Sequence, residues 1–354
     1  MTPEQASTGF ALPPSSTGFA LPPSSVHPRG TLRHAFFAVR HKKLSRFGLV
    51  LFACIVHLSV FADFFASSDP VLCRTPAGLV FLANVTHDPS VAAARARGEL
   101  TVYLHSAVPH GPDERSSLAL EPPLAFWDHP LGTDALGRDV LARLVHGARV
   151  LAGLALAVVA VLVVVGTVVG ALAGFFGGLF DVFVARLIET MSAFPTILLV
   201  LVLQAMSGQP SKLFLVIAVS IARFAEVVRV VRAEVLQIQN QEYVIAARAT
   251  GASPLRILWR HIAPNARAQA IASATFSLST LVLAIAACDF LGFGLSHIAP
   301  TWGEMMAQLR EHPTAWWLLV FPVLCLFALV LSQTVVGETL QDALDPRTGL
   351  HGDE

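Results

Sequence analysis

The sequence predicts an all-α integral membrane protein with about six transmembrane helices. Hydrophobic residues make up 54% of the 354 residues and charged residues only 14%, which is a low share of charges for a soluble protein of this size. Several apolar runs have about 20 residues, the length that a helix needs to cross a bilayer core of about 30 Å. The formal net charge is zero, which argues against a nucleic-acid-binding protein.

The N-terminal part predicts a tail followed by a first span. Residues 1–28 contain the sequence STGFALPPS twice, and because such Pro- and Ser-rich repeats cannot pack a core, we expect a disordered tail. Residues 29–46 form a basic cytoplasmic segment, and the apolar run at 47–66 is the first transmembrane helix. A cleavable signal peptide is the alternative; the long basic segment and the further spans argue against it.

A polar, net acidic segment at 67–149 follows the first span. We expect it to be an extracytoplasmic loop with a small fold of its own, because acidic loops are not retained on the cytoplasmic side as basic ones are. An amphipathic helix is expected at 135–146, next to the second span.

Signatures of catalysis and of metal binding are missing from the sequence. The stretch GTDALGRD at 132–139 lacks the Lys of a phosphate-binding loop, so we interpret its two acids as helix caps or ion pairs with nearby arginines. The residues concerned are Asp134 and Asp139 with Arg138 and Arg143. The 13 His show no ligand spacing and the four Cys form no CxxC pair, so neither a metal site nor a disulfide framework is expected.

Residues 150–340 are predicted to form a core of five further helices. The expected spans are 150–180, 190–211, 213–231, 268–288 and 313–337. An even number of spans returns the chain to the side from which it started, so both termini are expected in the cytoplasm, with 341–354 as a C-terminal tail. The Arg-rich stretch between the fourth and fifth spans agrees with this orientation.

Four glycines recur at every fourth position of the second span, and they are Gly166, Gly170, Gly174 and Gly178. This spacing puts them on one stripe of a helix, where the small residues allow a neighbouring helix to approach closely. We therefore expect helix packing along this stripe.

Ionisable residues at the edges of the third and fifth expected spans suggest specific roles. Arg186 and Glu189 are three residues apart, and we interpret them as a structural ion pair. Asp289 ends the fifth span on the outer side. It could line a translocation path or anchor the helix at the membrane interface, and the sequence leaves both interpretations open.

The stretch QEYVIAARATGASPLRILWRHIAPN at 241–265 is too polar to span a membrane and too long for a simple turn. Residues 242–250 are expected to form a short helix that Gly251 stops in a left-handed conformation. Ser253 and Pro254 favour the start of a second helix, which Pro264 is expected to break. The pattern predicts a rigid cytoplasmic knob for a partner protein, with an ordinary interfacial loop as the alternative.

This stretch resembles the EAA loop of ABC importer permeases. Ala246, Ala247, Gly251 and Pro264 match that motif in register. Two positions depart from it: Ile245 stands where the family has Glu, which bears on one polar contact to the ATPase, and Ala263 stands where the family has Leu. In the family this loop is the coupling helix that seats in a groove of the ATPase subunit. The resemblance implies a coupling site made of Glu242, Tyr243, Ala246, Ala247, Arg248, Gly251 and Pro264.

Three further stretches resemble the peptide and nickel branch of that family. They are HPLGTDALGRDVLARLVHGAR at 129–149, DFLGFGL at 289–295 followed by PTWGE at 300–304, and the segment from Gly337 to Arg347. The resemblance to this family covers about residues 30–350. Within the family, the chain is most similar to the subgroup that serves oligopeptides and microcin C.

The resemblance implies a type I ABC importer permease fold in the bacterial cytoplasmic membrane. The chain would be a non-catalytic permease subunit for peptides or peptide-like solutes, working by alternating access. The implied partners are a second homologous permease, two cytoplasmic ABC ATPases that bind the ATP, an extracytoplasmic solute-binding protein and the lipid bilayer. No cofactor is expected on the chain itself. The alternatives are a permease for nickel or another small solute and, in a different class, a secondary transporter.

Overall fold

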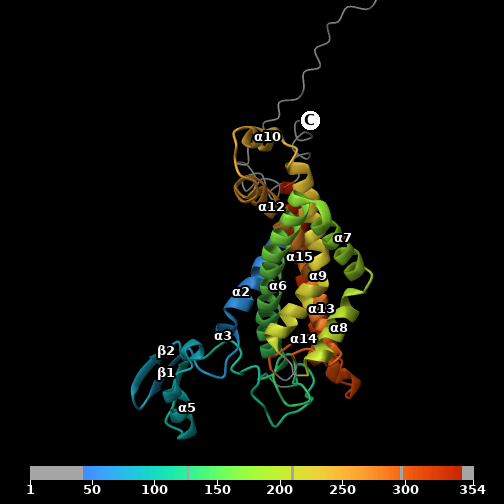
Figure 1. Cartoon of the computed structure of the whole chain (residues 1–354). Coiled ribbons are helices and arrows are strands. Elements are labelled where there is room, and N and C mark those ends of the chain that lie inside the picture. The colour runs from blue at the N-terminus through green and yellow to red at the C-terminus, as the bar shows by residue number, and fades with distance from the viewer. Residues whose placement is uncertain (1–42, 126, 209–210, 296–297, 345–354) are drawn as a thin grey trace, which may run out of the picture.

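The computed structural model describes residues 43–125, 127–208, 211–295 and 298–344 (Figure 1). The expected tail at 1–28, most of the basic segment at 29–46 and residues 345–354 of the expected C-terminal tail lie outside this range, whereas residues 341–344 of that tail belong to the last helix. The helices are α2 (Lys43–Val60), α3 (Ala62–Phe65), α4 (Ala83–Thr86), α5 (Pro89–Ala96), α6 (Val140–Phe176), α7 (Gly178–Ser192), α8 (Thr196–Ser207), α9 (Lys212–Ile238), α10 (Glu242–Ala249), α11 (Pro254–Ile257), α12 (Ala263–Phe276), α13 (Leu278–Phe290), α14 (Trp302–Ala307) and α15 (Trp317–Leu344).

The longest helix, α6, joins two elements that the sequence analysis separated. We expected an amphipathic helix at 135–146 and a span at 150–180, but one continuous helix of 37 residues begins after Asp139 and ends before Gly177. Asp139 caps it by accepting a hydrogen bond from the Ala142 amide at 2.7 Å. Gly137, with φ +74°, makes the preceding turn that delays the helix start.

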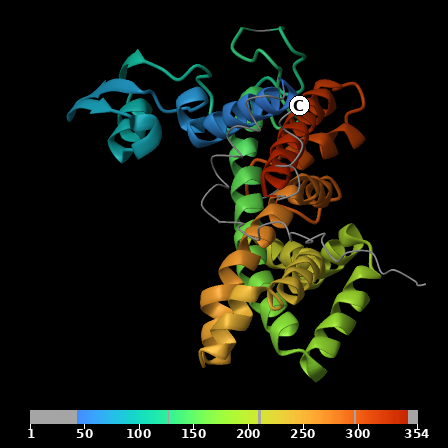
Figure 2. The same cartoon turned by 90° about the horizontal axis from the view of Figure 1, so that it is seen from above.

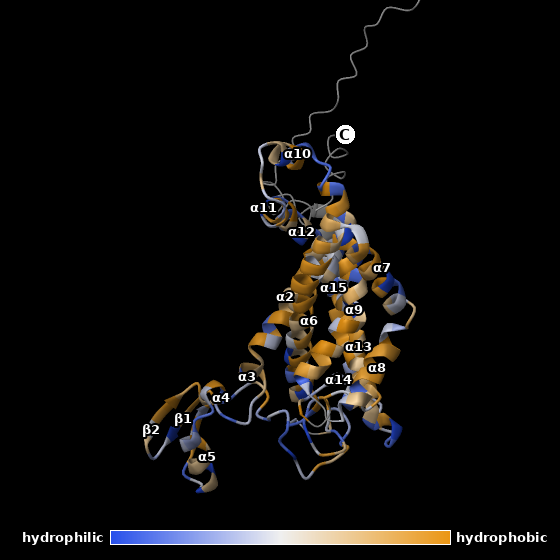
Figure 3. Cartoon of the chain, viewed as in Figure 1, coloured by the Kyte–Doolittle hydropathy of each residue, from blue (hydrophilic) through white to orange (hydrophobic). Residues whose placement is uncertain are grey.

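Within the described ranges, two helices, α6 and α15, are long and apolar enough to cross a membrane, and two bent helix pairs raise that number to four if each pair is one span. The protein is therefore a mostly helical membrane protein, as predicted, while the count of six spans stays a prediction. The apolar part of the first span, Ser45–Val60, is shorter than the other candidates. Figure 3 shows hydrophobic residues along the length of the helices.

The third and fifth expected spans are bent rather than straight. α7 and α8 meet at 92° because Pro195 lacks the amide hydrogen that would continue the helix. α12 and α13 meet at 45° at Ser277. The Ser277 hydroxyl is shared with two side chains of α9: Arg223 donates to it at 3.1 Å and it donates to Glu226 at 3.1 Å.

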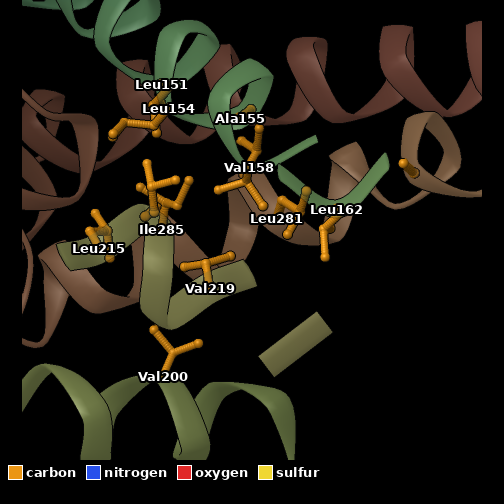
Figure 4. Packing of buried hydrophobic residues seen from close by; sticks show 14 of the residues in the cluster. Leu151, Leu154, Ala155, Val158, Leu162, Val200, Leu215, Val219, Leu281 and Ile285 are labelled. Carbon is orange, nitrogen blue, oxygen red and sulfur yellow. The ribbon is translucent and has the colours of Figure 1, made fainter. Parts of the chain in front are cut away.

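The main core forms where α6, α8, α9 and α13 face one another. Figure 4 shows aliphatic side chains of these four helices directed into one cluster. The side chains labelled there are Leu151, Leu154, Ala155, Val158 and Leu162 of α6, Val200 of α8, Leu215 and Val219 of α9, and Leu281 and Ile285 of α13. Helices from both halves of the chain therefore share a single core.

The segment at 67–149 contains a small sheet that the sequence analysis did not predict. Strands β1 (Leu72–Thr75), β2 (Gly78–Phe81) and β3 (Thr101–Leu104) pair antiparallel in the order β2-β1-β3. α5 begins after Asp88, whose carboxylate accepts from the Ser90 amide at 2.8 Å. Figure 2 shows the sheet and α5 to one side of the bundle, next to α2 and α3.

Candidate functional site

The predicted knob is two short helices joined at a glycine. α10 ends as expected at Gly251, which has φ +79° in the left-handed region. The Gly251 amide donates to Arg248 at 3.0 Å and the Ala252 amide to Ala247 at 3.1 Å, so the turn uses two carbonyls at the end of α10. Pro254 is at the start of α11, but Ser253 makes no side-chain cap there.

Pro264 does not end the helix before the next span, contrary to expectation. The five residues Leu258–Ile262 form a π-helical turn, and α12 follows it with Pro264 in its first turn. A π-helical turn pairs each amide with the carbonyl five residues back, as the Ala263 amide does with Leu258. This wider turn accommodates a residue that has no amide hydrogen, so α11 and α12 form one helical run.

α10 is attached through buried Val244, which belongs to the main core, and through contacts of Tyr243 and Arg248. The Asn265 amide group donates to the Tyr243 hydroxyl at 3.0 Å, and the Arg248 guanidinium lies over the Phe175 ring at 5.8 Å from its centroid. Phe175 is in the last turn of α6. Val244, which was not among the predicted coupling residues, is buried. Of the predicted residues on α10, Ala247 is half-buried and Glu242, Tyr243, Ala246 and Arg248 are exposed. Figure 1 shows α10 at the end of the bundle opposite to the sheet and α14.

Three of the four predicted glycines lie against α9. An added Cβ atom would lie 2.6 Å from Val227 Cγ1 at Gly166, 2.8 Å from Val231 Cβ at Gly170, and 2.9 Å from a backbone carbonyl of α9 at Gly174. Real Cβ atoms do not approach other atoms so closely. Along this stripe, the backbone of α6 is therefore in direct contact with α9.

Gly178 does not belong to the stripe, contrary to expectation. α6 ends at Phe176, and Gly177 and Gly178 both have positive φ, so the chain turns into α7 and nothing lies within 4 Å of an added Cβ atom at Gly178. α7 is held instead by Asp181, which accepts two hydrogen bonds from Arg232 of α9, one of them at 2.7 Å. The predicted Arg186–Glu189 ion pair is present at 2.6 Å.

A buried charge cluster joins two of the stretches that the sequence analysis singled out. Arg138 and Arg143 from the first stretch both pair with Glu304 of α14, and the Arg138–Glu304 distance is 2.7 Å. Arg138 also pairs with Asp134 at 2.6 Å, as predicted. The exposed fraction is 1% for the Arg143 side chain and 0% for Asp134. Burial of this kind is stable only when every charge has a partner.

Further hydrogen bonds extend this cluster toward α6 and α15. Asp139 pairs with His129 at 2.9 Å, and Trp302 donates its indole hydrogen to the Leu144 carbonyl at 2.9 Å. Trp317 donates to the Thr133 carbonyl at 3.0 Å. Sequence reasoning missed Glu304 as the acid shared by the two arginines. The only signal was that Glu304 ends the PTWGE stretch, and Glu304 is 161 positions away from Arg143 in the sequence.

Asp289 is buried at the end of α13, and its assignment to a translocation path or to a membrane interface stays a prediction. Its exposed fraction is 1%, and its carboxylate accepts from the Leu295 amide within the turn that follows α13. Gly303 packs so closely that an added Cβ atom would lie 2.5 Å from Asp289 Cβ. The structure thus gives Asp289 the role of fixing this turn against the start of α14.

Comparison with known proteins gives consistent results. Residues 166–350, more than half of the chain, match the family described as binding-protein-dependent transport system inner membrane component. The di/tripeptide transport system permease protein DppC of Pseudomonas aeruginosa (strain UCBPP-PA14) is 39% identical over 218 residues, which are 61% of this chain and 72% of that protein.

Two further relatives extend this comparison. The dipeptide transport system permease protein DppC of Haemophilus influenzae is 33% identical over 68% of this chain and 83% of its own length. The oligopeptide transport system permease protein OppC of Bacillus subtilis is 35% identical over 62% and 72%. The chain belongs to the family of binding-protein-dependent transport system inner membrane components.

Proposed function

We propose that this chain is a permease subunit of an ABC importer for peptides or peptide-like solutes. The observation that carries the proposal is the exposed knob of α10 and α11, built around the left-handed Gly251 at one end of a membrane bundle. Family membership supports the transport role. The names of the relatives support peptides rather than nickel as the solute.

In this proposal the knob receives the motion of a cytoplasmic ATPase. The outward side chains of α10 seat on the ATPase, and the contact of Arg248 with Phe175 passes the motion to α6. Two ATPases, which bind the ATP, a second homologous permease and an extracytoplasmic binding protein complete the importer. The chain itself holds the path and performs no covalent chemistry, and its two ends open alternately to the solute.

The orientation follows from the same proposal. The knob faces the cytoplasm, and the sheet and the buried charge cluster lie on the outer side. In a variant without the four native cysteines, a membrane-impermeant maleimide should label Ser117→Cys in intact cells and should label Ser253→Cys only after lysis. Both residues are exposed in the structure, so a difference in labelling would reflect the side of the membrane and not burial within the protein. Labelling of Ser253→Cys alone in intact cells would reverse the orientation.

Uptake by the reconstituted importer tests the function directly. Vesicles that contain this chain, its partner subunits and the binding protein should transport a labelled dipeptide only when ATP is present on the side of the membrane where the ATPases lie. Vesicles without this chain are the matched control. Uptake of Ni²⁺ with no uptake of peptide would show that the solute is nickel rather than a peptide. Uptake driven by an ion gradient without ATP would favour a secondary transporter.

A further inference from the structure

The small sheet at 72–104 has one covered face and one open face. On the covered face, Cys73 is fully buried and packs with Val80, Ala83 and Val91, so α4 and α5 cover this side. Residues opposite each other in an antiparallel pair point to the same face. The pairing of Cys73 with Val80 therefore assigns the alternate positions of β1 and β2 to the other face.

The open face is apolar. Leu72 pairs with Phe81 and Arg74 pairs with Leu79, so these four side chains share the face. Leu104 is the partner of Leu72 in β3, next to a register shift between Leu72 and Cys73. The exposed fractions are 65% for Phe81, 56% for Leu104 and 51% for Leu79. A water-facing sheet face normally carries polar residues. Apolar residues there indicate that something other than water covers this face in the cell.

Exposed apolar side chains connect this face to the end of the first span. Asn84 of α4 donates to the Asp63 carbonyl of α3 at 2.8 Å, and Ala66 bridges to Val108, so both ends of the segment that carries the sheet are fixed beside α3. Exposed residues continue from α2 to the sheet: Val60, Phe61, Phe64, Leu82 and Val85. Exposed apolar side chains are therefore present at the end of the first span, on α4 and on the sheet, and the hydrogen bond from Asn84 to α3 holds α4 beside that end of the span.

The acidic residues near the sheet lie beside α5 and not on the open face. Asp69 pairs with Arg95 of α5 at 3.1 Å, and Asp88 caps α5, so the acids belong to the side of the covering helix. Figure 1 shows α5 below β1 and β2, on the side away from the α10 end of the molecule. Arg74 is the charged residue among the paired positions of the open face, and a cation among apolar side chains suits a surface of anionic headgroups.

We propose that the open face, formed by Leu79, Phe81 and Leu104, lies in the headgroup region of the outer leaflet beside the first span. The assignment to the outer leaflet rests on the proposed orientation. Because the sheet is already tethered at the bilayer boundary, the contact needs no separate association step. Interfacial apolar and aromatic groups of this kind enter the headgroup and acyl boundary by about 5–10 Å.

Quenching by labelled lipids tests this contact in the full chain. We would replace the four native cysteines, place a polarity-sensitive fluorophore on Phe81→Cys, and reconstitute the chain in nanodiscs of phosphatidylethanolamine and phosphatidylglycerol. Lipids with a nitroxide near the headgroup should quench this probe at least about threefold more than a probe on Ala93→Cys, an exposed position of α5. A probe on Leu104→Cys gives a second reading if the first variant folds poorly.

Three outcomes decide the proposal. Strong quenching at both sheet positions together with weak quenching on α5 supports it. Equally weak quenching at all three positions overturns it, and so does a sheet probe that responds to added binding protein but not to labelled lipid, because a protein would then be the occupant. Quenching does not depend on transport, so it can succeed while peptide uptake fails, and the two proposals are tested separately.

Discussion

Gly251→Val should lower peptide uptake by about 5–30-fold while the chain still inserts and assembles. The left-handed conformation of Gly251 costs a residue with a Cβ atom about 1–2 kcal/mol, which lowers the ratio of native to non-native conformations of the knob by about 5–30-fold. Nothing lies within 4 Å of an added Cβ atom, so the effect acts through the backbone and not through a clash. The measurements are uptake and binding-protein-stimulated ATP hydrolysis in vesicles, with subunit stoichiometry on the same sample.

Gly208→Val is the matched control for this prediction. Gly208 ends α8 in the same conformation, with φ +67° and open space around it, so the backbone penalty is the same but the position is far from the knob. We expect uptake by this variant to stay within about twofold of wild type. Equal losses in both variants would mean that the defect is one of stability, and wild-type uptake by Gly251→Val would remove α10 and α11 as the coupling element.

Glu304→Ala should destabilise the protein by about 3–5 kcal/mol. The substitution leaves Arg138 and Arg143 buried without the carboxylate that they share, and removal of one partner from a buried ion pair costs far more than the pair itself contributes. Thermal unfolding of the purified chain, followed by tryptophan fluorescence, should show a midpoint lower by on the order of 10 °C. Glu304→Gln keeps the size and one acceptor oxygen and should have a smaller effect.

The exposed Arg186–Glu189 ion pair is the control for the buried cluster, because removal of its acid should change the stability far less. Its side chains are 74% and 61% exposed, so Glu189→Ala should cost at most about 1 kcal/mol after screening by solvent. A midpoint for Glu304→Ala within about 2 °C of that of Glu189→Ala would show that the cluster does not hold α14 to the start of α6.

Local chemistry made several elements predictable. Gly251 and Pro254 set the end of α10 and the start of α11, because each acts on its own backbone. The i,i+3 spacing of Arg186 and Glu189 predicted their ion pair in the same way. The apolar runs predicted membrane helices because length and composition suffice for that inference.

Elements that depend on distant residues were not predictable. Glu304 becomes important only when folding brings α14 to Arg143, and no pattern within either stretch encodes that contact. The stripe ended before Gly178 because two successive positive-φ residues turn the chain there, whereas the four-residue spacing alone continues past that point. Pro264 stayed within a helical run because the preceding π-helical turn changes the pairing of the backbone.

The continuity of α6 has a mechanical consequence. At 1.5 Å per residue its 37 residues span about 55 Å, well beyond the ~30 Å bilayer core. Arg143 near one end lies in the charge cluster, and Phe175 near the other lies under Arg248 of the knob. α6 is thus a lever with one arm at each membrane surface. A tilt of about 5° displaces one end of a rod of this length relative to the other by about 5 Å, more than the spacing of two successive Cα atoms, while every hydrogen bond within the helix stays intact.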